Sequence, residues 1–313
     1  MNTSEELKEL VRQKYGEIAQ AENAQGVVVD CCGPATAGVS TPGPSSPGAT
    51  SCCGPAVTDA SYSILMNDEY TSVEGYAVEA DLGLGCGLPT QFAHIKPGDV
   101  VVDLGSGAGN DCFVARAETG ETGRVIGLDM TPAMIDRARK NARTLGYTNV
   151  EFVYGDIEDM PLPESLADVV VSNCVMNLVP DKLKAFTETY RILKPGGHFS
   201  MSDIVLAGDL PDGLQRDAEL YAGCVSGAIP QQDYLRLVAE AGFTDVLVQK
   251  RKEINLPDQL LLNYLSPDAL QQYKSSPEQG IFSITVYAEK PGTAQPKPCC
   301  EASAGQEAGA ACC

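Results

Sequence analysis

The sequence predicts an α/β protein whose mostly parallel sheet is covered by helices on both faces. Short Val-rich segments alternate with longer segments of helical apolar spacing over the middle of the chain. Glycines or acidic residues directly follow several of the Val-rich segments, as in sheets that bind ligands at their strand ends. The 313 residues, 43% of them hydrophobic, suffice for one large domain with appendages.

The expected elements follow one another in order. Residues 5–20 have the apolar spacing of a short amphipathic helix. The expected strands are residues 99–104, 124–130, 150–157, 167–175, 198–206, 244–254 and 281–290. The expected helices between them are residues 109–118, 131–146, 181–197 and 233–243. Thr131 is a plausible N-cap, with Pro132 at the first helical position, and the third of these helices ends in a Pro-Gly-Gly turn.

Composition divides the chain into four parts. Residues 1–60 hold the N-terminal helix and a Gly/Pro/Ser-rich linker with cysteines, which cannot pack a core. Residues 61–250 hold the alternating pattern, with a helical insertion near residues 211–230 that we expect over the active edge of the sheet. Residues 251–291 supply C-terminal strands that complete the domain, and residues 292–313 are a low-complexity tail with cysteines that we expect to be disordered.

The net charge of −20 argues against nucleic acid and anionic membrane surfaces as partners. No run approaches the roughly 20 apolar residues of a membrane-spanning helix. The first twenty residues lack the apolar core of a secretory signal, so we expect a cytoplasmic protein. We also expect it to be a monomer.

Three acidic positions and a glycine-rich turn suggest a nucleoside-containing cofactor. The turn runs from Asp103 to Gly109 in the pattern G-x-G-x-G after the first main strand. Asp129 closes the next strand and suits the hydroxyls of a ribose, and Asp156 closes the third and suits an adenine amino group. Each aspartate alone could equally be a helix cap or turn residue, but the set is more specific.

The segments "VVDLGSGAG", "VIGLDM", "GDIEDMPLP" and "ILKPGGHF" resemble the successive strand-end motifs of the class I S-adenosylmethionine-dependent methyltransferases. The resemblance implies a Rossmann-like, seven-stranded sheet whose last strand is antiparallel. It also implies S-adenosyl-L-methionine as cofactor. The implied cofactor-binding residues are Asp103, Gly105, Ser106, Gly107, Gly109, Asp129, Met130, Asp156, Ile157 and Asn173.

Cysteine is the unusual residue, with 12 copies against two histidines. Cys174 lies at the carboxyl end of the fourth expected strand, near the place of the methyl group in this superfamily, while Cys86 and Cys224 lie among small residues in other loops. Three interpretations of Cys174 follow from this position: it is methylated itself, it binds the group that is methylated, or it is a small buried residue. The sequence contains no C-x-x-C pair, the spacing that is typical of structural zinc sites. Soft thiolates select thiophilic centres, and trivalent arsenic bound by three thiolates keeps a nucleophilic lone pair that needs no general base.

The segments "LGLGCG", "LGSGAGNDC", "SNCVMNLVPDK" and "YAGCVSGA" resemble one branch of the superfamily, the arsenite methyltransferases, over roughly residues 62–291. The resemblance implies that Cys174 and Cys224 bind arsenic and that Cys86 is the third thiol. It further implies that an upstream cysteine, either Cys52 or Cys53, forms a disulfide with Cys86 after transfer. Within this branch, the chain resembles the shorter microbial members.

The implied activity is arsenic detoxification by transfer of methyl groups to arsenite and to glutathione-bound or methylated trivalent arsenicals. Thioredoxin or glutathione would reduce the disulfide. Cys112, in "GNDC", resembles a packing residue instead. Two alternatives remain from the sequence: a methyltransferase of an organic metabolite, for which we find no catalytic base, and a metalloid-binding redox protein, against which the cofactor motif argues.

Overall fold

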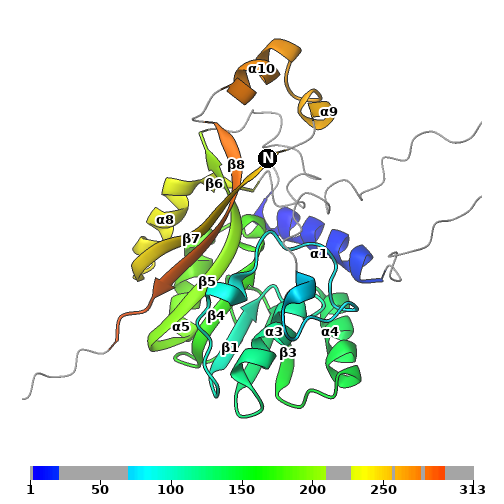
Figure 1. Ribbon diagram of the computed structural model, residues 1–313, viewed down its shortest axis with the longest axis vertical. Helices are drawn as coiled ribbons and strands as arrows, with labels where there is room; N and C mark the ends of the chain where they lie inside the picture. The colour runs from blue at the N-terminus through cyan, green and yellow to red at the C-terminus, as the bar shows by residue number, and fades with distance from the viewer. Residues whose placement is uncertain (1–2, 21–69, 209–226, 256–257, 276–278, 293–313) are drawn as a thin grey trace, which may run out of the picture.

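The computed structural model describes residues 3–20, 70–208, 227–255, 258–275 and 279–292. Within them one mixed sheet has the strand order β3-β2-β1-β4-β5-β8-β7 (Figure 1). The strands are β1 Val100–Leu104, β2 Arg124–Asp129, β3 Val150–Tyr154, β4 Ala167–Asn173, β5 Leu193–Ala207, β6 Ile229–Pro230, β7 Thr244–Ile254 and β8 Gly280–Glu289. The predictions for Cys224, Cys52 and Cys53 lie outside the described residues, as do those for the tail and most of the insertion.

The sheet is parallel from β3 to β5, and β8 runs antiparallel to both β5 and β7. The predicted α/β class and antiparallel last strand are confirmed. The sheet has eight strands rather than seven, because the two residues of β6 pair with β5 beside the main path.

Helices cover both faces of the sheet. The α-helices are α1 Ser4–Gln20, α3 Asn110–Thr119, α4 Pro132–Thr144, α5 Lys182–Ile192, α8 Gln231–Glu240, α9 Asp258–Leu261 and α10 Pro267–Ser275. Side chains alternate along β1, so that Val101 packs with α3 and α4 while Val102 packs with α5 and α8. This alternation gives the two apolar layers that hold the strand ends in place. Among the described residues, no helix is long and apolar enough to cross a membrane.

Two segments differ from the sequence prediction. The expected helix over residues 181–197 ends at Ile192, and the Pro-Gly-Gly segment lies within β5. The reason is that Gly196 and Gly197 exchange backbone hydrogen bonds with Lys290, just beyond β8. The short helices α9 and α10 lie between β7 and β8, within residues 255–280, for which the sequence predicted neither strand nor helix. The predicted boundary after residue 250 falls inside β7.

Phe186 of α5 gives a direct test of the core. Its ring stacks on Phe199 of β5 and meets Tyr234 of α8 edge to face, and it is fully buried. We expect Phe186→Ala to lower the free energy of unfolding by about 3–5 kcal/mol through cavity formation, measured by urea denaturation. Tyr154→Ala, at a side chain that is 55% exposed, should change it by less than about 0.5 kcal/mol. An equal loss in both variants would contradict this packing.

Candidate active site

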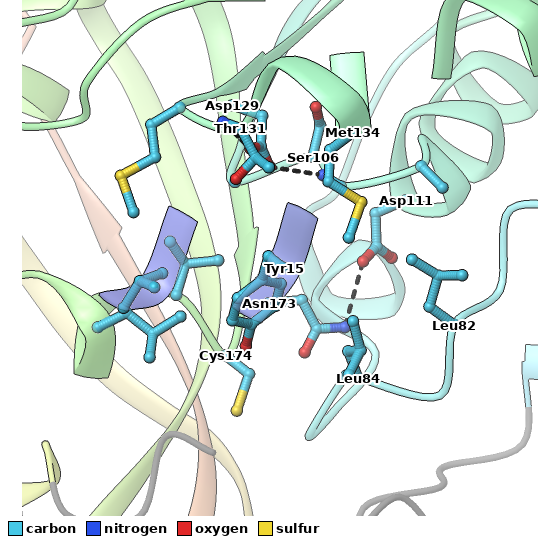
Figure 2. A pocket seen from close by; sticks show the side chains of 18 of the residues that line it. Tyr15, Leu82, Leu84, Ser106, Asp111, Asp129, Thr131, Met134, Asn173 and Cys174 are labelled. Carbon is cyan, nitrogen blue, oxygen red and sulfur yellow. Dashed lines mark hydrogen bonds between the residues drawn. The ribbon is translucent and has the colours of Figure 1, made fainter. Parts of the chain in front are cut away.

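A cleft opens at the carboxyl ends of β1, β2 and β4, where open α/β sheets bind their ligands. It encloses about 1070 Å³ of space, its open mouth included. In Figure 2, Asp129 and Thr131 lie at one end of the view, with Asn173 and Cys174 towards the other. Of the sequence-predicted residues, those that line the cleft are Gly105, Ser106, Gly107, Asp129, Met130, Asp156, Ile157, Asn173 and Cys174.

The glycine-rich turn after β1 forms one wall. Gly105 has a φ of +67°, and a Cβ there would lie 2.5 Å from Val175 Cγ2, so only glycine fits. Gly107 has a φ of +51° with open space where a Cβ would be. Between them, the hydroxyl of Ser106 is buried without a hydrogen-bond partner in the structure. A buried hydroxyl without a partner in a cleft wall suits a polar ligand.

Asp129 is held rigidly at the end of β2. One carboxylate oxygen accepts a hydrogen bond from the Thr131 backbone N–H at 2.7 Å, and the other accepts from Gly107 N–H at 3.0 Å. Burial raises the pKa of Asp129 although these hydrogen bonds oppose the rise. Thr131 has the predicted N-cap position before α4, but its side chain makes no capping bond. The carboxylate therefore fixes the turn and keeps lone pairs for a ligand.

Asn173, the last residue of β4, connects several loops around the cleft. Its side-chain NH2 donates to the Tyr70 hydroxyl, to the Gly87 carbonyl at 2.9 Å and to Asp111 at 3.2 Å. Its side-chain oxygen accepts from the Cys86 backbone N–H at 3.0 Å. Burial raises the pKa of Asp111 to about 6, although hydrogen bonds from Tyr70 and Asn173 oppose this rise.

Cys174 and Cys86 approach the same backbone carbonyl. The Cys174 N–H donates to the Ser202 carbonyl oxygen at 2.6 Å, and the Cys86 thiol lies 3.5 Å from that oxygen. Cys174 has a φ of +61°, a left-handed conformation that costs roughly 1–2 kcal/mol in a residue with a Cβ. Such strain commonly marks functional residues. Both cysteines belong to one buried apolar cluster.

Four predicted or suspected residues lie behind the cleft wall rather than in it. Asp103 is buried and accepts a hydrogen bond from the Cys112 thiol at 3.2 Å, so Cys112 packs within the fold as expected. Burial raises the pKa of Asp103 well above its ordinary value. Gly109 and Cys86 also do not line the cleft.

The cleft also has polar residues that the sequence did not single out. Tyr70 and Asp111 line it next to Asn173, and Lys8 and Tyr15 line it from α1. Asp111 immediately follows "GSGAGN" and lies in the first turn of α3, which was a usable signal. Among the residues that the structure describes, no three His, Cys, Asp or Glu side chains form a metal site.

The Asn173 network predicts the accessibility of Cys86, which is only 3% exposed. Asn173→Ala removes the acceptor for the Cys86 N–H and leaves Asp111 without this donor, so we expect a stability loss of about 1–3 kcal/mol. We also expect faster alkylation of Cys86, measured by mass spectrometry of its peptide. The control is Asn149→Ala, which removes a carboxamide bonded to Gly120 and Gly123 away from the cleft. Equal alkylation rates in the two variants would contradict the network's role.

Comparisons with known proteins agree with this geometry. Residues 95–242 match the family model described as a methyltransferase domain. An arsenite methyltransferase of Halobacterium salinarum is 39% identical over 289 residues, covering 92% of this chain and 67% of that protein. One from Aquipseudomonas alcaligenes is 39% identical over 188 residues, covering 58% of this chain and 54% of that protein. The chain thus spans about two thirds of the first relative and about half of the second.

A solved structure is similar as well. The arsenic(III) S-adenosylmethionine methyltransferase CrArsM from Chlamydomonas reinhardtii is 34% identical, with a TM-score of 0.57. The match covers 76% of this chain and 75% of that chain.

Proposed function

Because this chain belongs to the arsenite methyltransferase family, we propose that it transfers methyl groups from S-adenosylmethionine to trivalent arsenic held by its own thiolates. The observation that carries the proposal is that the Cys174 backbone N–H and the Cys86 thiol both contact the Ser202 carbonyl oxygen, while Cys174 lines the cleft. Two soft donors beside a cofactor-sized cleft suit a thiophilic substrate better than an organic one.

The chemistry of the cleft residues fits S-adenosylmethionine. Asp129 suits the ribose hydroxyls, Asp156 suits the adenine amine, and the hydroxyl of Ser106 has no other partner in the structure. Asp111 is partly buried, accepts a hydrogen bond from Asn173 and lines the same cleft as Cys174, and it suits the ammonium group of the amino-acid portion. The bound cofactor supplies an electrophilic methyl group on a sulfonium centre.

The cysteines hold the arsenic and orient its lone pair. Thiolates of Cys86, Cys174 and Cys224 displace hydroxide or glutathione from trivalent arsenic. Held by Asp129, Asp156 and Asp111, S-adenosylmethionine would supply an electrophilic methyl carbon to the arsenic lone pair, and the electron pair of the broken carbon–sulfur bond would stay on sulfur. No proton moves in this step, so the site needs no general base. The apolar cluster around Cys86 and Cys174 keeps competing water away.

Oxidation of the thiols of Cys86 and either Cys52 or Cys53 to a disulfide supplies the two electrons that return a pentavalent product to the trivalent state. Thioredoxin or glutathione then reduces the disulfide. We further propose that the enzyme is a monomer in the cytoplasm. Its other substrates are glutathione-bound and methylated trivalent arsenicals.

The thiol assignment is tested by serine substitutions. We expect Cys174→Ser and Cys224→Ser each to abolish methylation of arsenite and monomethylarsenite, because a hydroxyl cannot replace a soft thiolate. The assay measures methylated arsenicals with labelled S-adenosylmethionine in excess glutathione. Cys112→Ser is the control, since its hydroxyl still reaches Asp103, and it should keep most of the activity. Retained activity in Cys174→Ser would remove that thiol from the mechanism.

The Asp111 assignment predicts a pH dependence. Asp111 is charged above a pKa of about 6, so the affinity for S-adenosylmethionine should fall as the pH is lowered through that value. Asp111→Asn should weaken binding by about tenfold at pH 8 and flatten the pH profile, measured by calorimetry.

The free energy of unfolding should change with pH in the opposite direction to the affinity for the cofactor. A carboxyl group whose pKa is raised on folding favours the folded state below its unfolded pKa, and this contribution is lost as pH rises through about 6. The melting temperature of the ligand-free Asp111→Asn variant should therefore rise relative to wild type as the pH increases from about 4 to about 6, with a constant difference at higher pH. A variant that binds the cofactor with an unchanged pH profile would refute the assignment.

A further inference from the structure

Helix α1 covers part of the cofactor cleft, although it lies far from the methyltransferase-domain match in the sequence. Its residues Lys8, Val11 and Tyr15 line the cleft. Val11 is 2% exposed and packs in the apolar cluster that includes Cys174. At the other end of the helix, the Arg137 guanidinium donates to the Ala19 carbonyl at 3.2 Å. The helix is therefore held at both ends across the cleft.

Lys8 makes the strongest polar contact of this helix. Its ammonium lies 2.7 Å from Asp156 Oδ2 and 2.7 Å from Glu158 Oε2. Lys8 is 6% exposed and Glu158 is 7% exposed, so these are buried charges. Burial alone would lower the pKa of Lys8, but the hydrogen bonds to the two carboxylates raise it, and the ammonium stays charged.

The two carboxylates organise the loop that follows β3. Asp156 Oδ1 accepts from the Glu158 backbone N–H at 2.9 Å, which orients the Asp156 side chain. Glu158 Oε1 accepts from the Asp181 backbone N–H at 2.9 Å, at the start of α5. Lys8 thereby bridges α1, the β3 loop and the start of α5. The Asp156 side chain remains 36% exposed and lines the cleft, so part of the carboxylate still faces a ligand.

We propose that Lys8 is a positioning residue that fixes Asp156 for recognition of the exocyclic amine of adenine. This inference rests on the proposed S-adenosylmethionine site. It assigns part of the specificity for adenine to a residue outside the methyltransferase-domain match. A carboxylate accepts through four lone-pair sites, of which the Lys8 and Glu158 contacts occupy two. Without Lys8, Asp156 Oδ2 loses the hydrogen-bond donor that fixes its orientation, and repulsion from Glu158 adds to its displacement.

The test compares two product-type ligands by calorimetry on the full chain. S-adenosylhomocysteine carries the amine, and S-inosylhomocysteine carries a carbonyl oxygen in its place. Lys8→Met should raise the Kd of S-adenosylhomocysteine by about tenfold while changing that of S-inosylhomocysteine much less. Lys8→Arg should keep most of the discrimination. The control is Lys14→Met, the same change on the same helix away from these carboxylates.

If Lys8 only stabilised the fold, its loss would weaken the binding of both ligands equally. Removing one partner of a buried ion pair is strongly destabilising, so Lys8→Met is also combined with Glu158→Gln to remove the unpaired charge. The double variant should fold and still show the reduced discrimination. If both ligands weaken equally, or if neither changes, the positioning role is wrong. If the wild-type protein binds neither ligand, the proposed function fails together with this inference, whereas binding without arsenite methylation counts against the proposed function alone.

Discussion

The side-chain amide of Asn173 holds the site together. Its NH2 group donates to Tyr70, Gly87 and Asp111, and its oxygen accepts from the Cys86 backbone. An aspartate at this position would lack the donors and would repel Asp111, so a neutral amide is required. The residue after it is Cys174, so one side chain fixes the cofactor wall, the Cys86 loop and the position of the strand-end thiol.

This network also accounts for the glycines beside Cys86. A Cβ on Gly85 would lie 2.7 Å from Asn173 Nδ2, and a Cβ on Gly87 would lie 2.5 Å from Ser202 Oγ. The Ser202 carbonyl in turn receives the Cys174 N–H. The segment "LGLGCG" is thus glycine-rich because its backbone packs closely against the end of β4 and against β5. Neighbouring glycines bring Cys86 close to Cys174 without giving it direct access to the cleft.

Local patterns predicted the sheet and the strand-end carboxylates, because Asp129 and Asp156 owe their places to strands that the Val-rich segments reveal. The other contacts depend on long-range packing. Lys8 contacts Asp156, which is 148 residues away in the sequence. In the sequence alone, Lys8 cannot be distinguished from any other charged residue of an amphipathic helix. Asp103 closes β1 as expected, yet its side chain is buried against Cys112. Helices α9 and α10 escaped prediction because a 4-residue and a 9-residue helix give little periodicity.

The charge of the cleft bears on turnover. Four aspartates line it, and Lys8, the lysine that also lines it, is already paired with Asp156 and Glu158. In the proposed reaction the cofactor enters with two positive groups, a sulfonium and an ammonium, and one negative carboxylate of its own. It leaves with a neutral sulfur in place of the sulfonium. An acidic, partly desolvated cleft favours the cation over the neutral product. The carboxylates of the cleft therefore favour exchange of the spent cofactor for a fresh one, because methyl transfer itself removes a positive charge that held the ligand.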